Sequence, residues 1–123
     1  MSETSEIIHP GGCLCGGVRY EVRGPLEDIQ LCHCSLCRRA QGSAFAANIP
    51  VDEARLRLVS GEDLLTRFES SPGKLRAFCG RCGSPLLSQA AAKPGVVRLR
   101  AGTLVGPTGA RLGFRPSAGP EAH

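Results

Sequence analysis

The chain has 123 residues, of which 41% are hydrophobic and 21% are charged, and its formal net charge is +4. This length fits one domain and leaves no room for a second. It contains 16 Gly and 9 Pro but only 4 Phe, 1 Tyr and no Trp, so apolar packing alone would give a thin core. The 7 cysteines are therefore expected to stabilise the domain by binding metal.

The cysteine count also bears on the cellular compartment. An odd number of cysteines and a polar, acidic start over residues 1–6 argue against a secreted disulfide scaffold with a signal peptide. No run of about 18 apolar residues is present, so a membrane-spanning helix is not expected. We expect a cytoplasmic protein with reduced thiols.

The positive charge does not indicate nucleic acid as a partner. If all 7 cysteines bind as thiolates to two zinc ions, the net charge of +4 falls to about +1. The arginines are also spread along the chain instead of forming a basic block.

In chain order, residues 1–10 are predicted to be a flexible lead and residues 11–105 the ordered domain. Ser35 is expected to cap a short helical turn over 36–41, which Gly42 ends. The Gly-rich and Pro-rich residues 106–123 are predicted to be a disordered tail. The expected strands, which make the domain mainly β with short antiparallel strands, are 18–23, 26–32, 45–49, 55–59, 64–69, 74–78, 85–87 and 96–101.

Four cysteines in two separate pairs have the spacing of a structural zinc site. Cys79 and Cys82 are separated by two residues, as in a zinc knuckle, where backbone N–H groups can hydrogen-bond to both sulfurs. A predicted hairpin, with its turn at 70–73, ends at Cys79 and could bring this knuckle to Cys13 and Cys15, whose glycine neighbours allow the loop to bend. We predict a zinc site of Cys13, Cys15, Cys79 and Cys82. The alternatives are disulfides or a redox pair, which the odd cysteine count and the absence of a βαβ pattern disfavour.

The remaining cysteines form a second set at the predicted strand-to-helix turn. Cys32, Cys34 and Cys37 can surround one ion and leave its fourth position to water or substrate. His33 is a rival ligand, but it alternates with Cys32 and Cys34, so we favour a packing or hydrogen-bonding role for it. A second purely structural zinc, or a cluster of reduced thiols without metal, remains an alternative.

Three segments carry a family resemblance: Gly12 to Tyr20 (GCLCGGVRY), Cys32 to Arg39 (CHCSLCRR) and Phe78 to Gly83 (FCGRCG). In this order and spacing they resemble the signature segments of the glutathione-dependent formaldehyde-activating enzyme family, also called the centromere protein V-like domain, over about residues 11–105. The resemblance implies a mainly β fold like that of methionine-R-sulfoxide reductase B, with two zinc sites divided as above. It also implies the reversible condensation of formaldehyde with glutathione to S-hydroxymethylglutathione, a carbon-sulfur lyase reaction.

Two functional hypotheses follow. The first is a zinc-dependent carbon-sulfur lyase acting on a small thiol adduct, with Cys32, Cys34 and Cys37 holding the catalytic zinc. Arg38 and Arg39 are then candidate contacts for glutathione carboxylates. The alternative is a non-catalytic zinc-binding scaffold or interaction module with two structural sites.

The sequence departs from the family near its end. The family usually carries an Asp after the last strand and then a segment with His and Trp, whereas Val105 stands at that position here and no Trp follows. This departure bears on glutathione recognition more than on zinc binding.

Overall fold

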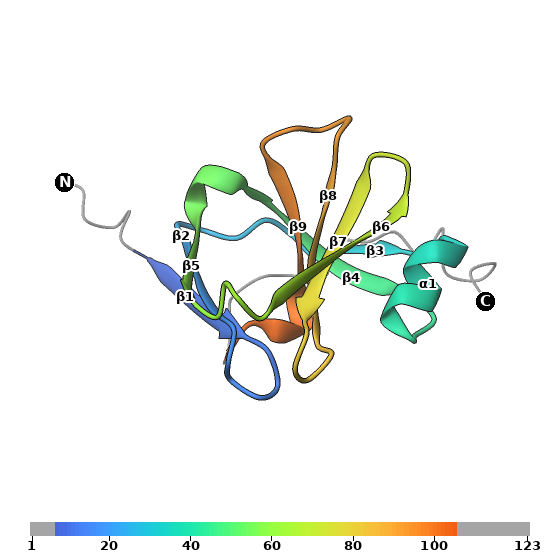
Figure 1. The fold of residues 1–123 in the computed structure, drawn as a ribbon. Coiled ribbons are helices and arrows are strands. Elements are labelled where there is room, and N and C mark those ends of the chain that lie inside the picture. The colour runs from blue at the N-terminus through green and yellow to red at the C-terminus, as the bar shows by residue number, and fades with distance from the viewer. Residues whose placement is uncertain (1–6, 106–123) are drawn as a thin grey trace.

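The computed structural model describes residues 7–105, which form two antiparallel sheets and one short helix (Figure 1). The three-stranded sheet has the order β1 (Ile8–Gly12), β2 (Arg19–Arg23), β5 (Leu56–Ser60). The six-stranded sheet has the order β3 (Gln30–Cys32), β4 (Ala46–Asp52), β9 (Val96–Arg100), β8 (Pro85–Ala90), β7 (Lys74–Cys79), β6 (Leu65–Ser71). The helical segments are α1 (Ser35–Gln41) and the 3-10 turns η2 (Glu53–Arg55) and η3 (Ala101–Thr103). The mainly β prediction is confirmed.

The core lies between the two sheets and is built from medium-sized side chains. Along β2 the exposure alternates, so that Tyr20 and Val22 point inward and join the same cluster as Ile49 of β4 and Leu99 of β9. Val22 and Leu99 are 0% exposed, and each such side chain contributes roughly 1.5–3 kcal/mol on burial. Among the described residues, Tyr20 is the single aromatic side chain in this core, as the composition led us to expect.

Strand β1 corrects the prediction of a flexible lead up to residue 10. Ile8 to Gly12 pair residue by residue with β2, and the Tyr20 ring covers Gly11 on the neighbouring strand. Burial raises the pKa of Tyr20 to about 12, and its hydroxyl lies 2.5 Å from the Thr103 hydroxyl. The lead prediction is therefore wrong for residues 8–10. Residues 1–6 and the predicted tail over 106–123 lie outside the described residues.

The predicted helical turn is present, but its cap is one residue earlier than expected. Cys34, not Ser35, is the N-cap, and its sulfur accepts a hydrogen bond from the Cys37 N–H at 3.3 Å. Gly42 ends the helix in the left-handed conformation with φ of 66° and donates its N–H to Arg38. A cysteine sulfur replaces the usual hydroxyl oxygen at the cap. No helix among residues 7–105 is long and apolar enough to cross a membrane.

The turn at Gly61 generates a stability prediction. Gly61 has a φ of +88°, and a Cβ there would lie 2.6 Å from Val18 Cα, whereas Gly95 has a φ of +84° and open space around it. We expect Gly95→Ala to lower the free energy of unfolding by about 1–2 kcal/mol, the cost of the left-handed backbone. Gly61→Ala should cost more than about 3 kcal/mol, because the backbone at Gly17 and Val18, at the start of the neighbouring strand β2, must also move away. Chemical denaturation of both variants measures the difference; equal losses would contradict the close approach.

Candidate metal centres

The first cluster consists of the four cysteines that the sequence assigns to a structural zinc, and the structure brings them together. The sulfurs of Cys13, Cys15, Cys79 and Cys82 all lie within 4.8 Å of one another. The Cys13 and Cys15 sulfurs are 3.5 Å apart, and those of Cys15 and Cys79 are 3.9 Å apart. A tetrahedral zinc with bonds of about 2.3 Å places its sulfurs about 3.8 Å apart. The donor set and its spacing therefore fit zinc.

Backbone N–H groups surround the sulfurs of this cluster. The N–H of Val18 donates to the Cys13 sulfur at 3.2 Å, and those of Arg81 and Cys82 donate to the Cys79 sulfur at 3.3 and 3.4 Å. Such bonds stabilise the thiolate form, which is the form that binds metal. This is the N–H pattern that the knuckle spacing predicts.

Side chains add to this effect. A hydrogen bond from the Gly17 backbone, followed by one from Arg81 at 3.4 Å, lowers the pKa of Cys15. The Ser84 hydroxyl, 3.1 Å from the Cys82 sulfur, is the main cause that lowers the pKa of Cys82 to about 5. Cys82 is thus ready to bind metal without losing a proton at neutral pH.

The cluster joins the two sheets. Cys13 and Cys15 lie on the loop between β1 and β2, and Cys79 and Cys82 lie at the turn between β7 and β8; the blue and gold loops at the bottom of Figure 1 carry these two pairs. The Leu14 N–H also donates to the Ser84 hydroxyl at 2.9 Å across the same junction. A metal here would link segments more than 60 residues apart, and it would do so at one edge of the core.

The second cluster consists of Cys32, Cys34 and Cys37, whose sulfurs also lie within 4.8 Å of one another. Cys32 ends β3, Cys34 caps α1 and Cys37 lies in the first turn of the helix. The Cys32 and Cys34 sulfurs are 3.6 Å apart. Cys37 is buried and Cys34 is exposed. Three converging sulfurs with one open side fit a metal that keeps a position for an exchangeable ligand.

The thiols of this cluster differ in acidity. Burial, followed by the neighbouring Cys37, raises the pKa of Cys32 to about 11. Burial also acts on Cys34, but the Cys37 N–H and the Cys37 thiol outweigh it and lower the pKa of Cys34 to about 7. Cys34 therefore ionises before Cys32, and it is the exposed member of the cluster.

The other residues singled out from the sequence lie around the second cluster. The His33 ring is tilted against Phe45 with centroids 5.7 Å apart, which agrees with the packing role favoured for it. Arg38 and Arg39 are exposed on α1. Their contact with glutathione carboxylates stays a prediction.

Two arginines beside the second cluster were not predicted from the sequence as site residues. Arg76 and Arg100 are only 7% and 3% exposed, and an Arg76 nitrogen lies 3.7 Å from the Cys37 sulfur. The signal that could have found both arginines is the adjacent helical turn, because a helix over one face of a sheet buries the polar residues of that face.

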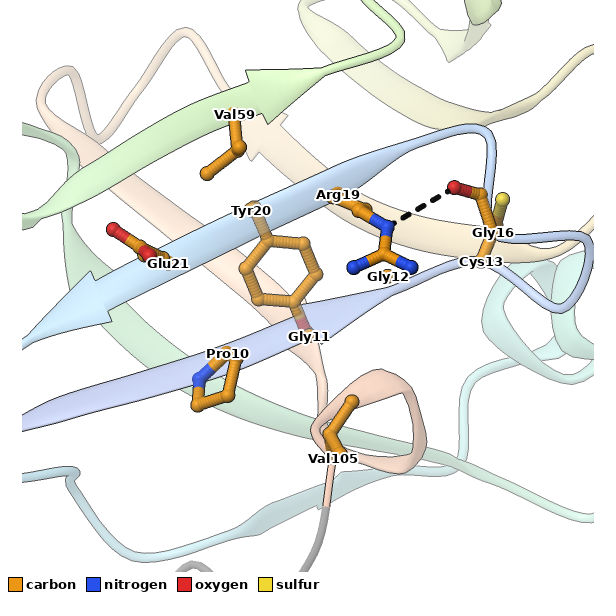
Figure 2. Close-up of a pocket in the computed structure, with 10 residues that line it drawn as sticks. All are labelled: Pro10, Gly11, Gly12, Cys13, Gly16, Arg19, Tyr20, Glu21, Val59 and Val105. Carbon is orange, nitrogen blue, oxygen red and sulfur yellow. Dashed lines mark hydrogen bonds between the residues drawn. The ribbon is translucent and has the colours of Figure 1, made fainter.

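Two pockets lie in different parts of the molecule. One, of about 430 Å³, lies over β1 and β2 beside Cys13; Figure 2 shows the Tyr20 ring in it and the Arg19 side chain hydrogen-bonded to the Gly16 carbonyl at 3.4 Å. The other, of about 350 Å³, lies between α1 and the knuckle and is lined in part by Arg76 and Arg100. The second pocket lies next to the cluster of Cys32, Cys34 and Cys37, because Arg76 lines the pocket and also contacts the Cys37 sulfur.

Comparison with known proteins agrees with this geometry. The model of the family described as glutathione-dependent formaldehyde-activating enzyme matches residues 8–119, which extends beyond the predicted bounds of 11–105 at both ends. A Halomonas elongata protein named for the same family is 37% identical over 88 residues, 65% of this chain and 55% of that protein. The chain thus spans about half the length of this curated relative.

A solved structure supports the fold. The crystal structure of a Rhodobacter sphaeroides protein superposes with a TM-score of 0.69 at 28% identity, over 86% of this chain and 99% of that one. Together with the two cysteine clusters and the family match over most of the chain, this shows that the protein belongs to the glutathione-dependent formaldehyde-activating enzyme family.

Proposed function

We propose that the protein is a zinc-dependent carbon-sulfur lyase acting on a small thiol adduct such as S-hydroxymethylglutathione, with two zinc ions per chain. The observation that carries the proposal is the second cluster, in which three sulfurs converge while the Cys34 side remains exposed. Family membership supports glutathione and formaldehyde as the reactants. We also propose a reducing compartment, the cytoplasm, because the seven cysteines form two thiol clusters in place of disulfides.

The chemistry needs charge stabilisation more than it needs a strong acid or base. In the condensation, the thiol sulfur bonds to the carbonyl carbon of formaldehyde and the thiol proton ends on the former carbonyl oxygen. A zinc ion held by Cys32, Cys34 and Cys37 would supply Lewis acidity toward the sulfur or the oxygen. The buried Arg76, 3.7 Å from the Cys37 sulfur, stabilises negative charge at the same place.

The alternative is a zinc-binding scaffold, in which both clusters are structural. The first cluster favours this role for one metal, because it lies where the two sheets meet and two of its four sulfurs accept backbone N–H hydrogen bonds. The two functions differ in whether the second metal exchanges its fourth ligand.

Metal content is the first prediction. The wild-type protein should hold two zinc ions per chain and Cys34→Ser one, since a serine hydroxyl is a poor zinc ligand. Elemental analysis of gel-filtered protein measures both ratios. A wild-type ratio near one that Cys34→Ser leaves unchanged would contradict the two-site assignment.

The two clusters are expected to differ in how much they contribute to the free energy of unfolding. We expect Cys79→Ser to lower the free energy of unfolding by more than about 3 kcal/mol, because it opens the link between the sheets. Cys34→Ser should lower it by less than about 1 kcal/mol, since Cys32 and Cys37 already lie close together in the chain. Thermal and denaturant unfolding of the zinc-loaded variants measures the contrast, and equal destabilisation would show that the second cluster is also structural.

Catalysis is tested by exchange NMR on mixtures of formaldehyde, glutathione and S-hydroxymethylglutathione. The wild-type protein should accelerate the exchange above the buffer rate, and Cys34→Ser should reduce this acceleration by about 100-fold or more. The matched control is Arg67→Met, an exposed substitution on β6, which should leave the rate unchanged. Two bound zinc ions without any acceleration would favour the scaffold.

A further inference from the structure

The cavity between α1 and the knuckle combines apolar walls with two buried cations. Its volume is about 350 Å³, and its apolar lining includes Phe68, Phe78 and Leu87. Arg76 and Arg100 complete the lining although both side chains are more than nine-tenths buried. Buried charged groups are rare unless they are paired, so the partners of these two guanidinium groups decide what the cavity can hold.

Arg76 has fewer partners than donors. Its Nε donates to the Ser70 hydroxyl at 2.8 Å and one terminal nitrogen donates to the Cys37 sulfur at 3.7 Å. The other terminal nitrogen, Nη1, is buried and has no hydrogen-bond partner among residues 7–105. A buried donor without a partner is costly. An acceptor that is not supplied by the described chain would remove this cost.

Arg100 has partners, but all of them are neutral. Its Nε donates to the Gln41 side chain at 3.0 Å, and one terminal nitrogen reaches the Asn48 amide oxygen at 2.5 Å and the Ser88 hydroxyl at 3.4 Å. Burial and then the nearby Arg76 lower the pKa of Arg100. Within the described part of the chain, the recorded ion pair joins Arg57 and Glu21 and involves neither buried arginine.

The charges around the second cluster do not cancel. A zinc ion with three thiolates carries a charge of about −1, and the two buried guanidinium groups add +2, so the site holds about +1 before a ligand enters. An incoming anion is therefore favoured. A thiolate at the metal is one such anion, and the cavity beside the cluster, which Arg76 and Arg100 line, offers room for a second negatively charged group.

We propose that Arg76 and Arg100 bind a carboxylate group of the substrate in this cavity while the substrate's thiol reaches the second cluster. The proposal rests on the proposed function and assigns to these two residues the selection of thiols that carry a carboxylate. Arg76 is suited to it because the same guanidinium touches the Cys37 sulfur and lines the cavity. A planar guanidinium also matches the two oxygens of a carboxylate better than a lysine would.

Binding of two short thiols to zinc-loaded protein tests the proposal without requiring turnover. Calorimetry should give at least about tenfold tighter binding for 3-mercaptopropionate than for 2-mercaptoethanol, which has the same thiol but no carboxylate. Arg76→Met should reduce this preference to near one, Arg76→Lys should restore part of it, and Arg67→Met should keep it in full. Equal binding of both thiols to the wild-type protein would overturn the proposal.

A measurement on the wild-type protein covers the case in which the Arg76 variants do not fold. Addition of 3-mercaptopropionate should shift the Nε–H signals of Arg76 and Arg100 in ¹H–¹⁵N spectra, while 2-mercaptoethanol leaves that of Arg100 in place. Shifts confined to Arg38 and Arg39 would overturn the proposal and support the contacts predicted from sequence.

The two proposals can fail separately. A carboxylate preference that depends on Arg76, in a protein that does not accelerate formaldehyde exchange, would support the carboxylate site and contradict the lyase. Accelerated exchange whose glutathione KM is unchanged in a folded Arg76→Met variant would support the lyase and overturn the carboxylate site.

Discussion

The convergence of four sulfurs from the two sheets is the feature on which the rest of the structure depends most, because a metal bound there would link the sheets. The core contains mostly Val, Leu and Ile side chains, with Tyr20 as its aromatic member among the described residues. Such a core buries less apolar area than one rich in Phe and Trp. Cys13 and Cys15, on the loop between β1 and β2, meet Cys79 and Cys82, at the turn between β7 and β8, at the edge of this core, where a bound metal would hold it closed.

The second cluster is local in the chain and depends on the first only through the large sheet. Its three cysteines lie within six residues, where β3 turns into α1, so a metal there gains little from closing a loop. What the fold adds is the environment: α1 covers one face of the large sheet and buries Arg76 and Arg100 beside the thiols. The local chain supplies the ligands, and the distant strands β7 and β9 supply the charge.

The sequence predicts the grouping of the cysteines well because metal coordination is strict in residue type and spacing. The division into a set of four and a set of three, the hairpin that delivers Cys79, and the end of α1 at Gly42 were all predicted and agree with the structure. Strand β1 was missed because its residues, Ile8 to Gly12, have weak strand character and are held by pairing with β2 and by Tyr20 packed over Gly11. Arg76 was not predicted as a site residue because strand alternation shows which residues share a face and does not show what covers that face.

The two clusters differ in the cations that approach them, and this difference agrees with separate roles. Arg81 donates to the Cys15 sulfur from an exposed position, where water and salt screen its charge. Arg76 approaches the Cys37 sulfur from a buried position, where the lower effective dielectric strengthens its interaction with any developing charge. A structural site needs no such strengthening, because its metal keeps the same ligands. Buried cations next to an exposed thiol are useful where the charge at the site changes. Such a change occurs when a thiol forms a carbon-sulfur bond with a carbonyl carbon and its proton is transferred to the carbonyl oxygen.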